Sequence, residues 1–559
     1  MVVGRTIKAA AALAVVSFSV VPVAPAQQVD EARAAQVDSL FASVDRPGSP
    51  GAALVVVRDG AVVYKRGYGW ANLEHKIPIT SSTVFDIASV SKQFTGMAIA
   101  MLVEQGKLSL DDDIRRHIPE VPDFGHTITV DHLVHHISGI RDWPGTLAVG
   151  GWRMDDVISF DQILRMVWNQ RDLNFDPGAE HLYSNTGYNL LAELVGRVSG
   201  QSFREWTHAN IFEPLGMHDT HFQDDHTEVI DNKAYAYARA REGYRALPNG
   251  LTALGSSSLF TSVDDLAKWA MNFDDGRVGG MAVIERMHQR GVLNDGEQIA
   301  YAFGLSIGNY RGLETASHSG GWAGFRTFLV RFPEHRFAVI LLSNLSSFNP
   351  SRRAYQVADI FLADHLEPRD TAEAGGGRAK VAVDPRILDE YVGTYRLGPG
   401  WLVTITREGD SLMTQATAER KFPMTAVSQT EFYVEAYGAA IEFRRDESGE
   451  VAHIEYRGMH APRVEPFTPA AGQLEEYKGV YYSEELDTSY ELVTDDEGLV
   501  ARHRRHGEIE LTPLLKDEFR GSMWFFRVVN FVRDDNGAVM GLLVTNGRSR
   551  NLRFVKMER

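Results

Sequence analysis

The chain has 559 residues, of which 44% are hydrophobic and 23% are charged, and it contains no cysteine. This composition is typical of a soluble folded protein and excludes a disordered, collagen-like or polytopic membrane protein. The formal net charge of −17 argues against nucleic acid as a partner, and the lack of cysteine excludes disulfides, thiolate zinc sites and a catalytic thiol.

The N-terminal segment 1–26 has the pattern of a signal peptide. Arg5 and Lys8 precede an apolar run at 9–20, and the small residues A-P-A at 24–26 are typical of a signal-peptidase cleavage site. The apolar run is too short for a good membrane span. We therefore expect a secreted or periplasmic bacterial protein with no membrane span after cleavage, with a retained N-terminal anchor as the alternative.

The first large block mixes the two hydrophobic periods. Asp59-Gly60 is typical of a tight turn and predicts a hairpin over 53–68. Apolar residues at helical spacing follow Ser89 and stop at Gly106, which predicts a helix. Further elements are expected as helices at 161–169, 186–199 and 263–272, and as a second hairpin of strands 326–332 and 337–343. Strands at both ends of the block predict one antiparallel sheet flanked by helices, an α/β (α+β) domain.

A connector and an internal repeat follow this block. Pro368 and three consecutive glycines at 375–377 are typical of a flexible linker. The run L-D-E-Y-V-G-T-Y at 388–395 recurs as L-E-E-Y-K-G-V-Y at 474–481, 86 residues later. This repeat, with short strands and turn residues, predicts two copies of one all-β antiparallel module, a small barrel or, as the alternative, a sandwich. The predicted units are a domain at 27–366, a linker at 367–385 and barrel modules at 386–470 and 471–559.

The Ser-x-x-Lys pattern formed by Ser89 and Lys92 is the strongest indication of chemistry. Ser89 lies where the predicted helix begins, and Lys92 lies one turn later on the same face. A helix N-terminus presents free N–H groups to a developing anion, and a neutral lysine can take the proton of a serine hydroxyl. Alone, the pattern also fits a helix cap beside a solvated lysine.

Two later segments favour the catalytic interpretation of Ser89 and Lys92 over a helix cap. Tyr183-Ser184-Asn185 follows a Pro-Gly turn, and His318-Ser319-Gly320-Gly321 precedes the second hairpin. In this order the three motifs resemble those of the penicillin-recognising serine hydrolases, in the branch of class C β-lactamases, D-aminopeptidases and esterases of the S12 peptidase type. Segments 106–112, 132–139 and 255–259 are also similar to that branch. Its D-aminopeptidase-like members carry lipocalin-like barrels, one loop of which shapes the active-site entrance.

The resemblance implies a role for each motif residue. Ser89 would be acylated, and Lys92 and Tyr183 would move its proton, with the immediate base left open between them. A cationic Lys92 would lower the pKa of the Tyr183 phenol. Asn185 would position Lys92 and the substrate, and the N–H groups of Ser89 and Gly321 would form an oxyanion hole.

Residues 318–322 are predicted to bind or support the substrate. His318 stands where β-lactamases usually carry lysine, and a histidine that is mostly neutral at pH 7 weakens selection for a substrate carboxylate. This favours D-aminopeptidases and esterases over β-lactamases, unless His318 only holds the strand by a hydrogen bond. Ser319 belongs to the same motif, and Gly320 and Gly321 would let substrate approach the strand. Trp322 either lines the pocket or packs in the core.

Two clusters were tested as metal sites. His132, His135 and His136 lie on one predicted helix, but Leu133 stands where the zinc motif needs glutamate. The acidic run at 111–113 lacks the spacing and glycine of a calcium loop and is expected to cap a helix. We therefore expect no metal and no other cofactor.

Together these patterns predict an exported serine hydrolase that works through an acyl-enzyme. Its partner would be a small molecule or a short peptide or amide, with D-residues, or a small ester. One alternative is a β-lactamase or DD-carboxypeptidase, and another is a non-catalytic receptor for cell-wall fragments, against which the complete set of Ser89, Lys92 and Tyr183 argues. The barrel modules would gate substrate size, or else stabilise or dimerise the protein, and homo-oligomerisation stays open.

Overall fold

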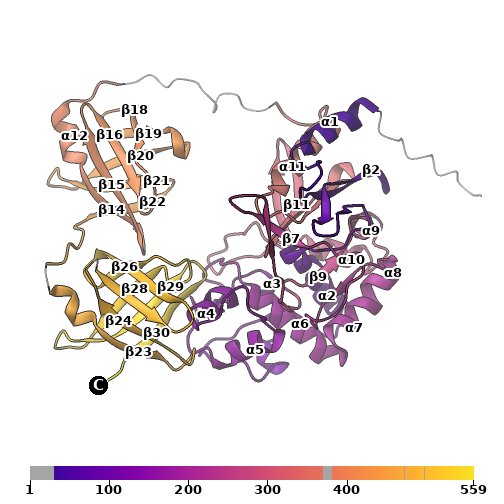
Figure 1. The fold of residues 1–559 in the computed structure, drawn as a ribbon, viewed down its shortest axis with the longest axis horizontal. Coiled ribbons are helices and arrows are strands. Elements are labelled where there is room, and N and C mark those ends of the chain that lie inside the picture. The colour runs from indigo at the N-terminus through magenta and orange to yellow at the C-terminus, as the bar shows by residue number, and fades with distance from the viewer. Residues whose placement is uncertain (1–30, 369–380, 471, 497, 559) are drawn as a thin grey trace, which may run out of the picture.

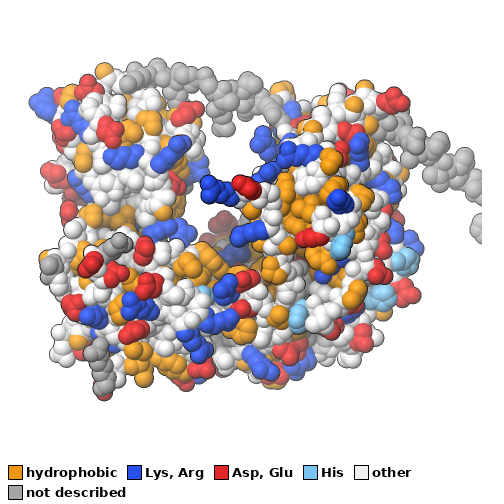
Figure 2. All heavy atoms as spheres, in the orientation of Figure 1, with side chains coloured by type: hydrophobic (Ala, Val, Ile, Leu, Met, Phe, Trp, Pro, Cys, Tyr) orange, Lys and Arg blue, Asp and Glu red, His pale blue; other side chains and the backbone are white. Residues whose placement is uncertain are grey.

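The computed structural model describes residues 31–368, 381–470, 472–496 and 498–558 (Figure 1). The predicted signal peptide and residues 369–380 of the predicted linker lie outside these residues. A mixed α/β part, an upper β part and a lower β part, drawn in yellow, are distinct in Figure 1. On the face drawn in Figure 2, acidic and basic side chains are interspersed over all three parts.

One six-stranded antiparallel sheet organises the α/β part, in the order β10-β11-β12-β13-β1-β2. The two ends of the block meet in it as predicted, because the first strand pairs with the last over the register Ala52↔Ser343 to Arg58↔Phe337. Both predicted hairpins are present. The strands are β1 (Ala52–Arg58), β2 (Ala61–Tyr68), β10 (Ser306–Tyr310), β11 (Leu313–Trp322), β12 (Phe325–Phe332) and β13 (Phe337–Ser343).

Alternate residues of β1 face two separate cores, as the two-residue period of a strand requires. Leu54 and Val56 pack with α1 (Glu31–Phe41) and α11 (Pro350–Phe361). Ala53 and Val55 pack in the larger core with the helices on the other face. These helices are α2 (Lys92–Glu104), α3 (Val130–Val134), α4 (Trp143–Val149), α5 (Phe160–Asn169), α6 (Asn185–Ser199), α7 (Phe203–Thr207), α8 (Glu213–Leu215), α9 (Val263–Asp275) and α10 (Met281–Met287).

Local capping explains where the predicted helices begin and end. Ser159 and Ser262 accept hydrogen bonds from the third N–H of α5 and α9, and Gly200 ends α6 with a φ of 74°. Short strands connect the helices, namely β3 (Trp70–Asn72), β4 (Ile77–Pro78), β5 (Phe85–Asp86), β6 (His221–Phe222), β7 (Ala236–Arg239), β8 (Tyr244–Leu247) and β9 (Leu259–Thr261). Within the described residues, no helix is both long enough and apolar enough for a membrane crossing.

Two β modules follow, which confirms the predicted fold class. The first is a nine-stranded sheet that nearly closes on itself behind α12 (Pro385–Tyr391), and the second is a closed barrel of β23 to β30. The first contains β14 (Gly393–Gly398), β15 (Trp401–Glu408), β16 (Ser411–Ala416), β17 (Phe422–Pro423), β18 (Thr425–Ala426), β19 (Glu431–Val434), β20 (Ala439–Arg445), β21 (Val451–Tyr456) and β22 (Met459–Val464). The second contains β23 (Gly479–Ser483), β24 (Thr488–Thr494), β25 (Leu499–His503), β26 (Gly507–Leu515), β27 (Glu518–Gly521), β28 (Val528–Arg533), β29 (Val539–Asn546) and β30 (Ser549–Lys556).

The sequence repeat is also a repeat of contacts. The Tyr395 hydroxyl donates to the Tyr391 carbonyl at 2.9 Å, and the Tyr481 hydroxyl donates to the Tyr477 carbonyl at 2.8 Å. In the first module the Tyr391 ring packs against Phe432 and Phe443. In the second module the Tyr477 ring packs against Phe519 and Phe531, which stand at the matching positions of the repeat. Both modules therefore use the same aromatic cluster to close their cores.

The second barrel docks directly on the α/β part, beside α4 (Figure 1). Ala148 and Val149 of α4 pack in the core of that barrel, and the Tyr490 hydroxyl donates to the Val149 carbonyl at 2.9 Å. Arg141 forms an ion pair with Glu485 at 2.5 Å, with 0% and 6% of the two side chains exposed. This buried ion pair stabilises the docking of the two parts, because removal of either partner would leave the other charge buried with neither a counter-charge nor water to solvate it.

Replacement of Glu485 by glutamine should therefore lower the free energy of unfolding by about 3 kcal/mol, since it leaves the Arg141 charge buried without a counter-charge. Equilibrium urea unfolding of the full chain measures the change. The neighbouring Glu484 is the matched control, because its pair with Arg171 is exposed by 81% and 63% respectively. Glu484→Gln should cost less than about 0.5 kcal/mol. Equal losses in the two variants would contradict a docking role for the buried pair.

Candidate active site

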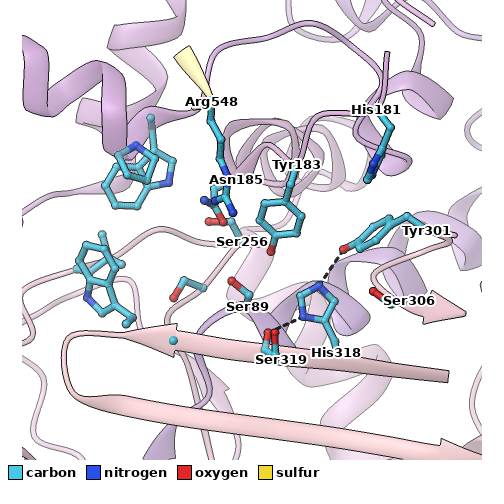
Figure 3. Close-up of a pocket in the computed structure, with 16 residues that line it drawn as sticks. Ser89, His181, Tyr183, Asn185, Ser256, Tyr301, Ser306, His318, Ser319 and Arg548 are labelled. Carbon is cyan, nitrogen blue, oxygen red and sulfur yellow. Dashed lines mark hydrogen bonds between the residues drawn. The ribbon is translucent and has the colours of Figure 1, made fainter. Parts of the chain in front are cut away.

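Three of the sequence motifs meet in one pocket of about 560 Å³ (Figure 3). Ser89, Tyr183, Asn185 and His318 all line it, although they come from distant parts of the chain. The remaining lining residues are Trp143, Pro144, His181, Leu251, Ser256, Ser257, Tyr301, Ser306, Ser319, Gly321, Trp322 and Arg548. The last of these belongs to the second barrel, so the pocket lies between two parts of the protein.

Ser89 lies just after a constrained turn between β5 and α2. Ala88 has a φ of 48°, in the left-handed region that alanine rarely adopts, and its N–H donates to the buried Asp86 side chain at 2.7 Å. A single turn of 3₁₀-helix, Ala88–Ser91, then leads into α2. The turn leaves Ser89 half-buried between two buried neighbours, with its side chain at the pocket.

The strand β11 packs closely against this turn. A Cβ at Gly320 would lie 2.2 Å from the Ile87 carbonyl oxygen, so glycine there permits backbone packing rather than substrate approach, which corrects the sequence-based expectation. Gly321 instead is exposed and lines the pocket. Because β10 pairs only with residues 313–317 of β11, residues 318–322 present an open strand edge at the pocket.

Lys92 is fully buried beneath the pocket. Its Nζ donates to Asn185 Oδ1 at 2.7 Å and to the Ser256 carbonyl at 2.8 Å, and it lies 4.8 Å from the Tyr183 ring centroid. Burial lowers the pKa of Lys92 well below its usual value. A neutral amine has two N–H bonds, both satisfied here, and a lone pair that remains able to take a proton.

The pKa of Tyr183 is raised, whereas the sequence led us to expect a decrease. Burial raises the pKa of Tyr183, and the neighbouring Ser89 and Arg548 oppose this increase only in part. The reason is that burial acts on the lysine too, so no stable ammonium is present to favour a phenolate. Tyr183 is therefore a phenol, and no hydrogen bond of normal geometry joins its hydroxyl to another of the described residues.

His318 is neutral and has a defined tautomer. Its Nδ1 lies 2.7 Å from the Ser319 carbonyl and must donate to it, so Nε2 accepts from the Tyr301 hydroxyl at 3.0 Å (Figure 3). Burial lowers the pKa of His318 to about 3. The imidazole thus supplies no positive charge, as expected, and it also holds the strand through its hydrogen bonds.

Trp322 has both of the roles weighed from the sequence. It lines the pocket, and it packs against the main core and against Trp143 at 5.6 Å between ring centroids. Its Nε1 donates to Asn249 Oδ1 at 3.0 Å, and the Asn249 amide donates to Asp86 at 2.7 Å. The indole is therefore connected to the turn that carries Ser89.

The three histidines near residue 135 have separate partners. His132 Nδ1 accepts from the Thr129 N–H, His135 lies 3.0 Å from Asp131, and His136 Nδ1 accepts from the Ser184 N–H. In the part of the chain that the structure describes, no three histidine or acidic side chains are grouped to hold a metal ion. Of the acidic run, Asp113 caps a short 3₁₀-helix, as predicted.

Several residues that line the pocket or lie next to it were not predicted from the sequence. Asp142 accepts hydrogen bonds from Asn185. It lies three residues after segment 132–139, which resembles the family, and this position could have indicated that it lies near the site. Ser256 lies within another such segment. Tyr301 and Arg548 carry no local pattern, and only the folded chain brings them to Ser89.

Comparison with known proteins agrees with this geometry. The Beta-lactamase family model matches residues 34–363, and a domain of unknown function, DUF3471, matches residues 377–468. Penicillin-binding protein 4* of Bacillus subtilis is 29% identical over 75% of this chain and 96% of its own. A D-aminopeptidase of Brucella anthropi is 24% identical over 91% of this chain and 96% of its own. The octameric penicillin-binding protein homologue from Pyrococcus abyssi shares the fold, with 24% identity, a TM-score of 0.55 and coverage of 86% and 99%.

The tautomer of His318 predicts its behaviour in solution. Since its pKa is lowered to about 3, His318 should stay neutral from pH 5 to pH 8, with the proton on Nδ1. Nitrogen-15 NMR of histidine-labelled protein measures this, and the resonance is assigned by its loss in His318→Gln. A His318 resonance that titrates with a midpoint between pH 6 and pH 7 would contradict the buried, neutral imidazole.

Proposed function

Because this chain belongs to the Beta-lactamase family and is a serine hydrolase that works through an acyl-enzyme, we propose that it is exported and cleaves short peptides or amides with D-residues, or small esters. The observation that carries the proposal is the meeting of Ser89, Tyr183 and the buried amine of Lys92 at one pocket. The D-aminopeptidase similar to this chain along nearly its full length supports the choice of substrate.

In the proposed reaction Ser89 Oγ attacks the substrate carbonyl carbon, and its proton passes to Lys92 Nζ. Lys92 is the better base, because burial lowers its pKa while burial raises that of Tyr183. The Tyr183 phenol then protonates the leaving amine or alcohol as the carbon–nitrogen or carbon–oxygen bond breaks. Water attacks the acyl-enzyme in the second half, with the same groups moving the proton in reverse.

The oxyanion that forms in both halves needs donors placed in advance. We assign this role to the N–H groups of Ser89, in the turn before α2, and of Gly321, on the open edge of β11. Donors of this kind are commonly worth about 3 kcal/mol each. Asn185, which accepts from Lys92, positions the amine, and the 318–322 edge supports the substrate.

A β-lactamase or DD-carboxypeptidase is the second candidate, and one observation favours it. His318 is uncharged, but the guanidinium of Arg548 lines the same pocket and could meet a substrate carboxylate. The similarity to a penicillin-binding protein points the same way. We rank this candidate second because Arg548 already faces the Asp142 carboxylate at 3.3 Å.

We also propose that the protein is secreted or periplasmic, on the pattern of residues 1–26 alone. The second barrel is proposed to shape the pocket entrance, since one of its turns supplies Arg548. Homo-oligomerisation stays a prediction, which light scattering of the purified protein would test.

Replacement of the nucleophile is the direct test of the mechanism. Ser89→Ala should abolish hydrolysis and labelling by a fluorophosphonate while leaving the melting temperature unchanged, because Ser89 is only half-buried. Intact-mass spectrometry measures the label, and Ser82→Ala, at an exposed serine outside the pocket, is the control that should label fully. Retained turnover in Ser89→Ala would refute the acyl-enzyme mechanism.

The substrate class can be read from which acyl-enzyme forms and then disappears. Intact mass is followed in parallel with a D-alanyl amide, its L-alanyl counterpart, a penicillin and a p-nitrophenyl ester. We expect transient adducts with the D-amide or the ester and a persistent adduct with penicillin. Rapid turnover of penicillin without amide hydrolysis would favour the β-lactamase, and binding of cell-wall fragments without any adduct would favour a receptor.

A further inference from the structure

The turn between β29 and β30 of the second barrel reaches into the pocket of the α/β part (Figure 3). The Arg548 carbonyl accepts from the Asp142 N–H at 3.2 Å and from the Asn174 side chain at 2.9 Å. The Ser549 hydroxyl donates to the Asp142 carbonyl at 3.0 Å. These bonds fix the backbone of the turn without using the Arg548 side chain, so the side chain remains available for other contacts at the pocket.

The Arg548 guanidinium contacts two groups of the catalytic cluster, Asp142 and Tyr183. Its Nη1 lies 3.3 Å from Asp142 Oδ2, and its central carbon lies 4.8 Å from the Tyr183 ring centroid. About half of the Arg548 side chain is exposed, whereas only 3% of the Asp142 side chain is. The arginine therefore brings a hydrated charge to the edge of a carboxylate that has almost no contact with solvent.

Asn185 connects this carboxylate to Lys92. Asp142 Oδ1 accepts from the Asn185 N–H at 2.7 Å, and both carboxylate oxygens lie 3.1 Å from the Asn185 side-chain nitrogen. The other end of that amide, Oδ1, accepts from Lys92 Nζ at 2.7 Å. The buried acid and the buried amine are thus separated by one amide group, close enough for the charge of each to affect the other.

The charges that act on Lys92 oppose one another. Asp142 raises the pKa of Lys92 and Arg548 lowers it, with burial as the largest cause of the overall decrease. The other titratable groups that face the amine are uncharged: the rings of Tyr183 and Tyr188, whose pKa values burial raises, and the imidazoles of His136 and His318, whose pKa values burial lowers. Burial therefore has the largest effect on the pKa of Lys92, and among the charged neighbours the balance between Asp142 and Arg548 adjusts it.

We propose that Arg548 is a positioning residue supplied by the second barrel, which occupies the Asp142 carboxylate so that this carboxylate does not hold Lys92 as an ammonium. The uncharged amine then receives the proton when the Oγ–H bond of Ser89 breaks and the new N–H bond forms. At the same time Ser89 Oγ bonds to the substrate carbonyl carbon, and the carbonyl oxygen takes up the negative charge. This inference rests on the proposed function in one respect, that Lys92 is the base. It makes the docked barrel part of the acylation machinery rather than only a wall of the pocket.

The test is the pH dependence of the second-order rate constant for acylation of the full chain by a neutral p-nitrophenyl ester. Arg548→Gln leaves Asp142 uncompensated, so the pKa of Lys92 rises and the acidic limb moves up by about one pH unit. Below the limb, where the rate follows the fraction of neutral amine, acylation should be about tenfold slower. Arg548→Lys keeps the positive charge and should keep the limb near its original position.

A second variant makes the test independent of any loss of packing at Arg548. Asp142→Asn removes the negative charge and keeps the oxygen that accepts from Asn185, so the limb should move to lower pH. In the double variant Asp142→Asn/Arg548→Gln both charges are absent, and the limb should return toward its original position. A role in packing alone would make the two losses add and would leave the limb where it was.

Arg550 provides the matched control, because it lies two residues after Arg548, in β30, and pairs with Glu180 at 2.9 Å rather than with Asp142. Arg550→Gln should leave the acidic limb unchanged. An unmoved limb in Arg548→Gln, or an equal movement in Arg550→Gln, would overturn the inference. Ester label that does not reside on Ser89 would instead overturn the proposed function, so the two failures are distinguishable by peptide mapping.

Discussion

The burial of one amine is the constraint on which the rest of the pocket depends. Lys92 begins α2 with no solvent contact, and its hydrogen-bond partners come from the first residue of α6 and from the segment before β9. Loss of hydration makes the charged form unfavourable, so each surrounding group must either satisfy the N–H bonds or balance a charge nearby. Helices α2 and α6, the segment that contains Ser256, and the second barrel through Arg548 all contribute groups that stabilise this buried amine or balance the charge near it.

The sequence predicted features that depend on neighbouring residues along the chain. Asp59-Gly60 predicted the hairpin of β1 and β2, apolar residues at helical spacing predicted α2, and the 86-residue repeat predicted two β modules, because turn geometry, helix period and duplication are all local. The motif residues Ser89, Tyr183, Asn185 and His318 were also found, since their order resembles a known family, and the structure brings them to one pocket.

Other features could not be predicted, because they depend on burial and long-range contact. The pKa of Tyr183 moved opposite to expectation, since the sequence places lysine beside the phenol but does not show that both are buried. Gly320 was assigned to substrate approach, although its missing Cβ admits the Ile87 carbonyl. Arg548 lies more than 400 residues from Ser89, and no local pattern connects a barrel turn to a distant serine.

Each β module has its own copy of the same aromatic cluster, but among the described residues that line the pocket only Arg548, of the second module, comes from either of them. The order of synthesis therefore has a consequence. A ribosome makes the nucleophile and its lysine early and reaches position 548 several hundred residues later. Throughout that interval the nascent pocket lacks the guanidinium that faces Asp142. The contact between Arg548 and Asp142 can therefore form only after the second barrel has been synthesised and folded.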